Sequence, residues 1–280
     1  MDHLNPLTKH FRQPAVYLKL PSYGKYWPEG SLNLPANGEL PVYPMSTKDE
    51  IILRTPDALI NGAGVVEVIR SCIPSIVDPW AMPSVDVDAC LIAIRIASYG
   101  NDMRISTTCP KCKNISDHEI DLAQALDQIV MPNFDELIEV DELRIKIKPQ
   151  NYFSVNQSNS VNYEEQRILS ILNATEMSDQ EKELNLRSIT DKLIALNLEN
   201  LTNSTEYILM SDGISVKDPA FINEFYANAQ SLVIRKIRDH ITTIANDAGI
   251  KPYHSECEAC SNPFDTTVIF DYSNFFDLGS

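Results

Sequence analysis

The stretches Cys109-Pro-Lys-Cys112 and Cys257-Glu-Ala-Cys260 decide how this chain of 280 residues folds. A two-residue gap lets both thiolates of a tight turn point toward one tetrahedral cation, and four thiolates complete its coordination. An apolar residue lies four positions before each first cysteine, and an alternating run begins eight positions after each second cysteine. This repeated strand–knuckle–strand pattern predicts a zinc ribbon that holds one structural zinc ion per chain. The predicted ligands are Cys109, Cys112, Cys257 and Cys260.

Other uses of paired cysteines fit this pattern less well. A redox-active Cys-X-X-Cys motif usually stands alone near a βαβ pattern, and a disulfide framework suits a short secreted chain. An iron–sulfur cluster also takes four thiolates, so it stays open as the alternative to zinc. The two remaining cysteines, Cys72 and Cys90, have apolar neighbours in the sequence. We expect them to be small buried side chains rather than ligands.

The separation of the two pairs adds a prediction about topology. Residues 113–256 lie between them, so a shared ion would join two distant parts of the chain. Closing a long loop restricts the unfolded chain more than closing a short one. We therefore expect metal binding to contribute to folding rather than to catalysis. His118 and His254 lie beside the knuckles and are expected to be neighbours of the site, because four cysteines already complete it.

The composition is that of an acidic globular protein. The hydrophobic fraction of 44% supports a folded core, which excludes a wholly disordered chain. The formal net charge is −16 at pH 7 and no block of Lys and Arg occurs, so nucleic-acid binding is disfavoured. No segment approaches the length of a membrane span, and the first residues lack the pattern of a signal peptide. We therefore expect synthesis in a reducing cytoplasm and no membrane insertion.

The positions of proline, glycine and helix-capping residues predict an α+β fold. Seven prolines among the first 45 residues favour extended geometry over helix. Beyond residue 46 apolar residues recur with helical spacing, and the strongest helix is capped by Ser84 and ended by Gly100. The predicted regions are a proline-rich N-terminal arm of extended chain and short strands (1–45), a helical core domain (46–104), a split β zinc ribbon (105–122 plus 252–272), and an acidic stretch, linker and helical insert (123–251).

The arm contains an aromatic loop whose role the sequence leaves open. Tyr23, Tyr26 and Trp27 lie in one turn-rich segment of six residues, 23–28. Such a short loop cannot bury three large rings by itself. They either fold back onto their own domain or bind a partner protein, where Tyr and Trp are favoured contact residues. Tyr23, Tyr26 and Trp27 are therefore the candidate partner-binding residues.

The second half of the chain predicts one strand and several helices. The strand covers 143–148 and is followed by a polar linker over 151–162. Helices are predicted over 163–176, over 178–198 from a capping box, and over 218–248 with an apolar stripe that starts at Phe221. A helix as long as the last one can form the spine of a bundle or an interface for self-association, and both possibilities stay open.

No catalytic motif is recognisable in the sequence. The nine glycines do not form a phosphate-binding loop, and no nucleophile elbow occurs. No histidine is spaced with an acid and a nucleophile in a pattern typical of hydrolases. We therefore expect a protein that is not an enzyme and has no small-molecule substrate.

Several stretches of the first half resemble a known family. They are Asp49-Glu50-Ile51, Leu53-Arg54-Thr55-Pro56-Asp57-Ala58-Leu59, Asp78-Pro79-Trp80 and Leu91-Ile92-Ala93-Ile94-Arg95-Ile96-Ala97-Ser98-Tyr99-Gly100. In these residues the chain resembles the baseplate hub proteins of T-even-like bacteriophages with contractile tails. The resemblance extends over residues 1–125, is most specific within 45–100, and places the first knuckle where members often carry one.

The resemblance implies a structural or assembly component of the tail baseplate. Such a protein binds other baseplate and hub proteins, belongs to the virion tail and is present in the host cytoplasm during assembly. The family does not decide between a part of the particle and an assembly factor. Two alternatives stay open: a zinc-ribbon regulator that binds a host protein or nucleic acid, and a hub-associated cell-wall hydrolase with paired carboxylates.

Overall fold

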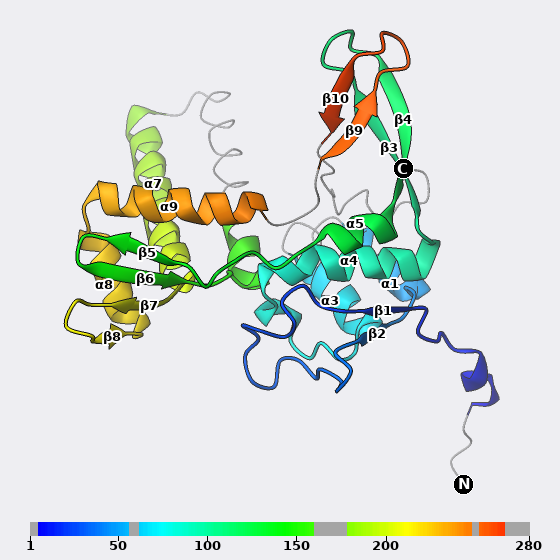
Figure 1. Ribbon diagram of the computed structural model, residues 1–280, viewed down its shortest axis with the longest axis horizontal. Coiled ribbons are helices and arrows are strands. Elements are labelled where there is room, and N and C mark those ends of the chain that lie inside the picture. Colours follow the sequence, from blue (N-terminus) through cyan, green and yellow to red (C-terminus); the bar gives the residue numbers. More distant parts are fainter. Residues whose placement is uncertain (1–4, 56–61, 160–177, 248–251, 267–280) are drawn as a thin grey trace. The chain divides into compact units, whose positions relative to one another are not determined.

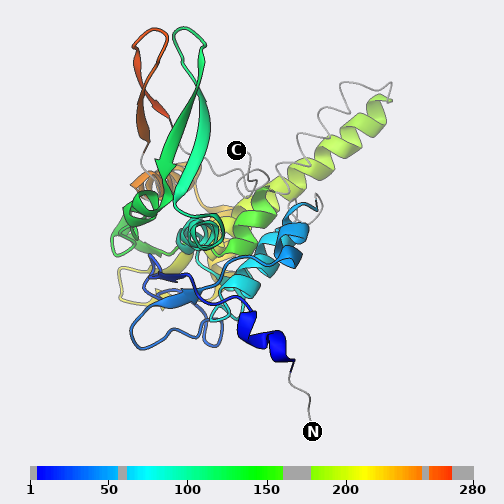
Figure 2. The same ribbon diagram turned by 90° about the vertical axis from the view of Figure 1, so that its right-hand side faces the viewer.

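The computed structural model describes residues 5–55, 62–159, 178–247 and 252–266, and Figures 1 and 2 show it from two directions. It confirms the predicted α+β class, because small antiparallel sheets and helices occur along the whole described chain. The contacts between residues divide the chain into two compact units. Unit 1 comprises residues 1–131 and 249–280, and unit 2 comprises residues 132–248.

Unit 1 combines short helices with two-stranded sheets. Its described elements are η1 (Pro6–His10), β1 (Val16–Leu18), β2 (Leu40–Val42), α1 (Thr47–Leu53), α3 (Ala63–Cys72), η2 (Pro79–Ala81), α4 (Ser84–Tyr99), β3 (Asp102–Thr108), β4 (Ile115–Asp121), α5 (Leu122–Gln128), β9 (Tyr253–Glu256) and β10 (Pro263–Thr266). Strand β1 pairs with β2, β3 with β4, and β9 with β10, each pair antiparallel. The last two hairpins are far apart in the sequence but belong to the same unit.

Helix α4 is the centre of the apolar core of unit 1. Its sequence is apolar on almost every side, and Leu91, Ile92 and Ile94 are at most 1% exposed. Strand β1 and helices α3 and α5 contact this helix. The helix ends at Gly100, whose φ of 91° lies in the range that favours glycine. The predicted central helix and its end at Gly100 are therefore confirmed. Its predicted cap is wrong, because Ser84 is the first helical residue and the N-cap is Pro83, which makes no side-chain capping hydrogen bond.

The proline-rich N-terminal segment contributes to this core. Arg12 ties it to the helices, since its guanidinium donates hydrogen bonds to the carbonyls of Pro44 and Ser71 and to the carboxylate of Asp49, at 2.7, 2.8 and 3.0 Å. Residues Pro6–His10 form a short 3-10 helix where extended chain was predicted, because proline is tolerated at the first helical position. The aliphatic side chains of the segment that are at most 2% exposed are Leu18, Leu20, Leu40 and Val42.

Unit 2 contains an antiparallel sheet in the order β5-β6-β7-β8, with helices against it. Its described elements include β5 (Leu137–Val140), β6 (Leu143–Ile147), α7 (Asp179–Asn203), β7 (Thr205–Leu209), β8 (Ser215–Val216), α8 (Pro219–Asn228) and α9 (Ser231–Asp247). The sheet corrects the prediction of one strand in an otherwise helical insert. The additional strands are short, and strands of this length depend on cross-strand pairing and burial more than on intrinsic preference.

The predicted single helix over 218–248 is wrong, because the chain leaves helical geometry between α8 and α9. Ala229 has extended backbone angles, with φ −69° and ψ 150°. A straight helix of this length would span about 45 Å, whereas a sheet of four strands is roughly 20 Å wide. The break lets α8 contact β7 while α9 contacts β5. The predicted stripe is wrong at its start as well, since Phe221 is 62% exposed and Ile222 is buried.

Other boundaries in unit 2 were predicted with mixed success. The capping box of Ser178 and Glu181 starts α7 as predicted, and the helix continues to Asn203. The predicted linker over 151–162 is wrong in its first part, because residues 152–159 are helical and Tyr152 is buried. The predicted helix over 163–176 and the strand expected at 268–270 lie outside the described residues.

Among the helices that are described, none combines the length and apolarity needed to cross a bilayer.

Candidate metal centre

Both Cys-X-X-Cys pairs lie at the ends of β-hairpins in unit 1. Strands β3 and β4 pair along seven residues each, and the first cysteine pair lies in the connection between them. Strands β9 and β10 pair along four residues each around the second cysteine pair. Figures 1 and 2 show the connections of the two hairpins side by side. We call the four strands and their two connections the ribbon.

The first knuckle is closed by two backbone hydrogen bonds. The N–H of Cys109 donates to the carbonyl of Asn114 at 2.9 Å, and the N–H of Lys113 donates to the carbonyl of Cys109 at 3.0 Å. Lys113 has a φ of 62°, which turns the chain back toward β4. The turn therefore places the Cys109 and Cys112 side chains on the same side of the connection, where both can face one ion.

The second knuckle repeats this geometry residue by residue. The N–H of Cys257 donates to the carbonyl of Asn262 at 3.1 Å, and the N–H of Ser261 donates to the carbonyl of Cys257 at 2.8 Å. Ser261 has a φ of 50°. These supporting residues were not predicted from the sequence. A signal was available, because an asparagine follows the second cysteine by two positions in both knuckles.

The four sulfur atoms of the ribbon converge. The Sγ atoms of Cys109 and Cys260 are 3.8 Å apart, and those of Cys112 and Cys257 are 3.5 Å apart. All four lie within 4.8 Å of one another. Zinc–sulfur bonds of about 2.3 Å at tetrahedral angles place sulfur atoms roughly 3.8 Å apart. The donor set and its spacing are therefore compatible with one metal ion shared by both hairpins.

Hydrogen bonds and neighbouring thiols perturb the acidity of this cluster. The backbone N–H groups of Cys112 and Lys111 stabilise the thiolate of Cys109 and lower its pKa to about 6. The neighbouring thiol of Cys112, above all, raises the pKa of Cys260 to about 12. Thiolates this close repel one another, so they do not all ionise at neutral pH without a cation. A divalent metal ion would favour the fully deprotonated set.

The ribbon has a mainly polar interior next to this cluster. Thr107, Ser116 and Ser255 are at most 7% exposed. The rings of His118 and Tyr253 are in contact across the hairpins, with centroids 6.1 Å apart, and His118 is not part of the sulfur cluster. Since little apolar surface is buried here, packing alone contributes little to holding the two hairpins together.

Cys72 and Cys90 behave as predicted. Both are buried, with 0% exposure, and neither belongs to the sulfur cluster. Burial, above all, raises the pKa of Cys72 to about 12, so its thiol stays protonated at neutral pH. The two cysteines are therefore core residues of unit 1.

The three aromatic residues of the loop between β1 and β2 differ in their exposure and contacts. Tyr23 is 75% exposed and has a φ of 53°. Tyr26 has a φ of 66°. Trp27 is half-buried, and its indole N–H donates a hydrogen bond to Asp86 at 2.8 Å. Positive φ angles at residues other than glycine are uncommon, so the surroundings must hold this loop in place.

Asp86, on α4, anchors this loop, and this role was not predicted from the sequence. Its carboxylate is fully buried and accepts hydrogen bonds from the backbone N–H of Ser22 at 2.9 Å and from the Ser22 hydroxyl at 2.5 Å, besides the one from Trp27. Burial raises the pKa of Asp86, although these hydrogen bonds oppose the shift. The available signal was an acidic residue in the first turn of a mostly apolar helix.

Comparison with known protein families identifies a family for this chain. A family model described as T4 bacteriophage base plate protein matches residues 18–277. This range contains the four clustered cysteines, the aromatic loop and Asp86, and it extends through both units. No curated protein and no solved structure matches the chain.

Proposed function

This chain belongs to the T4 bacteriophage base plate protein family, and from that premise we propose that it is a non-enzymatic structural or assembly component of the hub region of a contractile tail baseplate. The family match over residues 18–277 carries the proposal. The match also confirms that the resemblance of residues 45–100 is to baseplate proteins. In this role the chain is made in the host cytoplasm, joins the virion tail and binds other baseplate subunits.

Within this role, the sulfur cluster binds one structural zinc ion per chain. The ligands are Cys109, Cys112, Cys257 and Cys260. Sulfur separations of 3.5 and 3.8 Å support a single tetrahedral ion. An iron–sulfur cluster would place several iron and sulfide atoms between the cysteines and would hold their sulfur atoms further apart. The zinc ion joins hairpins that have little apolar interior, so its role is structural.

The aromatic loop is the proposed partner-binding surface, with a different task for each residue. Tyr23 is the main anchor, because its ring is 75% exposed and exposed tyrosines are favoured in the centre of interfaces. Trp27 and Asp86 hold the loop in one conformation before binding, which lowers the entropic cost of association. Tyr26 is half-buried in the same loop and adds to this surface. The partner is another baseplate subunit.

Incorporation into tails tests this function. Phage particles would be produced in which every copy of the chain carries Tyr23→Ser, with Tyr17→Ser as the matched control. Tyr17 is 64% exposed but lies on β1, outside the loop. Mass spectrometry of purified tails should detect the wild-type chain and Tyr17→Ser. The amount of the Tyr23→Ser chain in purified tails should be lower by about tenfold or more, because loss of a central anchor usually costs over about 2 kcal/mol of binding free energy.

Four outcomes would contradict parts of this proposal. Equal incorporation of both variants would remove Tyr23 from the interface. A chain that is required for infectivity but is absent from purified tails would be an assembly factor rather than a hub component. Turnover of peptidoglycan by the purified chain would establish an enzyme, and a second copy recovered in place of another subunit would make self-association its main contact.

A further inference from the structure

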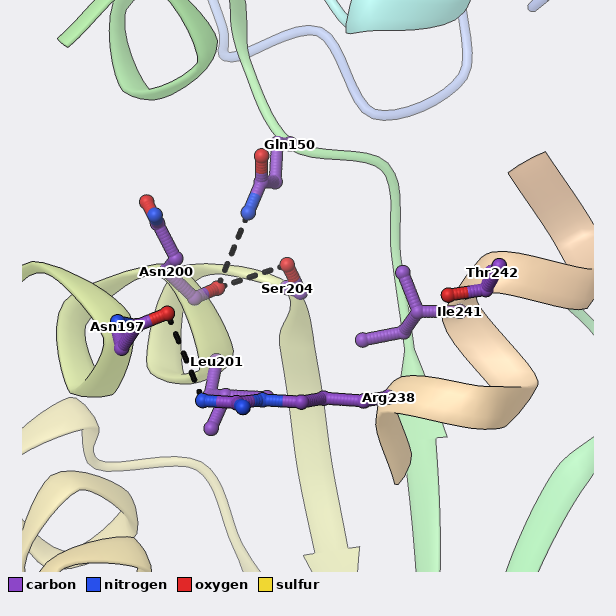
Figure 3. A pocket seen from close by; sticks show the side chains of 8 residues that line it. All are labelled: Gln150, Asn197, Asn200, Leu201, Ser204, Arg238, Ile241 and Thr242. Carbon is purple, nitrogen blue, oxygen red and sulfur yellow. Dashed lines mark hydrogen bonds between the residues drawn. The ribbon is translucent and has the colours of Figure 1, made fainter. Parts of the chain in front are cut away.

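Unit 2 contains a polar pocket between α7, α9 and the chain that follows β6. Its volume is about 240 Å³, and Figure 3 shows the side chains that line it. Gln150, Asn197, Arg238 and Thr242 supply polar groups, and Leu201 and Ile241 supply apolar surface. None of the described residues that line it is acidic, although the chain has a formal net charge of −16.

Arg238 is the charged group of this pocket. Its side chain extends from α9 toward Asn197 on α7 (Figure 3). Among the described residues it makes one hydrogen bond, from Nη2 to the Asn197 Oδ1 at 3.5 Å, and no ion pair. A guanidinium offers five N–H donors, and a distance of 3.5 Å is long for a hydrogen bond. Most of the donor capacity of Arg238 is therefore available to a ligand.

The neighbouring groups add hydrogen-bonding capacity and apolar contact. Gln150 donates one long hydrogen bond, to the carbonyl of Asn200 at 3.4 Å. Its Oε1 atom and the Thr242 hydroxyl have no partner among the described residues. Leu201 is buried and Ile241 is half-buried, so they add apolar contact beside the exposed Arg238. The pocket therefore offers one cation with hydrogen-bonding groups of both kinds.

We propose that this pocket binds a carboxylate presented by a polypeptide, namely an Asp or Glu side chain or a C-terminus of a partner. A planar carboxylate can accept two parallel hydrogen bonds from a guanidinium, which suits one Arg without a second cation. Gln150 and Thr242 can bind the peptide groups next to that carboxylate. A pocket of about 240 Å³ is smaller than those that enclose drug-sized ligands, so it accommodates one side chain with adjacent backbone.

In the assembly role proposed above, the ligand is an acidic segment of a neighbouring baseplate subunit. Only this identification of the partner rests on the proposed function. Carboxylate binding rests on Arg238 and its surroundings alone. The two claims therefore fail separately, provided that binding by the purified chain and incorporation into tails are both measured.

Side-chain NMR of the purified full-length chain, with arginine isotopically labelled, tests the pocket. N-acetylglutamate N-methylamide is the probe, and N-acetylglutamine N-methylamide is its uncharged counterpart. The acidic probe should shift the Arg238 signals and bind at least about tenfold more tightly than the neutral one, since charge-assisted hydrogen bonds are roughly twice as strong as neutral ones. Arg238→Gln should abolish this difference. Arg238→Lys should retain part of it, because it keeps the charge but loses the planar fork.

Arg235→Gln is the matched control. Arg235 is also an exposed arginine on α9, but it does not line the pocket. Its substitution should leave probe binding unchanged. Equal effects of the two Arg→Gln variants, or equal binding of both probes, would overturn the proposal. A thermal melt of each variant shows whether it is folded. If Arg238→Gln unfolds, probe binding by Arg238→Lys still tests the pocket.

Two further results concern the source of the carboxylate. The sequence carries Glu164 and Glu165 a few residues after the helix at 152–159. If replacing both with Gln raises the affinity of the acidic probe, this chain fills its own pocket and the partner proposal is overturned. Loss of probe binding in Arg238→Gln with normal incorporation into tails would support the carboxylate site and refute its role in assembly.

Discussion

The core around α4 and the ribbon belong to the same unit, yet their interiors consist of different residues. Leu91, Ile92 and Ile94 of α4 are at most 1% exposed and are surrounded by apolar side chains. Near the sulfur cluster the inner positions of the ribbon are occupied by Thr107, Ser116 and Ser255, and the buried apolar pair of Met103 and Ile120 lies at the other end of the β3–β4 hairpin. The core is therefore stabilised by apolar burial, whereas the ribbon brings together four sulfur atoms from distant segments.

This difference indicates which interactions stabilise each region. Apolar packing requires only that the surrounding elements form, so the core around α4 can fold without a metal ion. The ribbon buries too little apolar surface to offset the entropy of joining two distant hairpins. In the role we propose, it depends on a metal ion, whose binding free energy becomes folding free energy. The two regions should therefore respond separately to metal removal and to core substitutions.

Metal removal should have the largest effect. Structural zinc contributes an apparent binding free energy of about 10–16 kcal/mol in small zinc-dependent folds. We expect one zinc ion per chain by elemental analysis. After chelation, amide hydrogen exchange should become fast in β3, β4, β9 and β10 and remain slow in α4. Cys112→Ser should give the same result, and Lys111→Ser, an exposed position in the same knuckle, should not.

Two results would contradict this difference in metal dependence between the core and the ribbon. Loss of protection in α4 after chelation would mean that the core also depends on the metal ion. Full protection of the ribbon in a chain without metal would mean that its polar interior is sufficient to hold the hairpins together. Iron in place of zinc would change the metal but leave the comparison intact.

A core substitution should have the next largest effect. It should destabilise the core around α4 and leave the metal site of the ribbon intact. Leu91→Ala removes a side chain that is 1% exposed and leaves a cavity. The free energy of unfolding should decrease by about 2–5 kcal/mol, measured by denaturant titration. The zinc content should stay at one ion per chain. Ile115→Ala is the control, because Ile115 is 68% exposed in the ribbon and its loss should change stability little. Loss of zinc from Leu91→Ala would show that the ribbon cannot form without an intact core.

Asp86→Asn should have the smallest effect of the three. The amide would lose one acceptor and place an N–H₂ group against a donor of Ser22 or Trp27, which should lower the free energy of unfolding by about 1–3 kcal/mol. The fluorescence of the half-buried Trp27 should change with it. Trp80→Phe would remove the only other tryptophan and isolate this signal.

The pH dependence of this variant has a definite sign. Burial raises the pKa of Asp86 above its ordinary value of 3.8, so the folded chain binds the proton more tightly than the unfolded chain. The stability of the wild-type chain relative to Asp86→Asn should therefore fall as pH rises from 3.8 through the raised pKa, and should level off above it. A rise over the same range would show that the hydrogen bonds outweigh burial.

Local patterns could be predicted from the sequence with few errors. The Cys-X-X-Cys spacing, the capping box at Ser178, and the limits of α4 each depend on residues within a few positions of one another. The physical reason is that caps, knuckles and helix ends are made by backbone groups that are neighbours in the chain. The baseplate resemblance was carried by the same kind of local pattern, in residues 45–100.

The sequence by itself determined the metal ligands we propose, the central helix and the family, because each is encoded within short segments. Only the tertiary structure decided what depends on distant residues: that Trp27 lies against Asp86, that β5 to β8 form one sheet, that the helix expected over 218–248 breaks at Ala229, and that Arg238 lines a pocket. These features follow from burial and pairing between segments far apart in the chain. Their energies are gained only once the segments meet, so no local pattern records them.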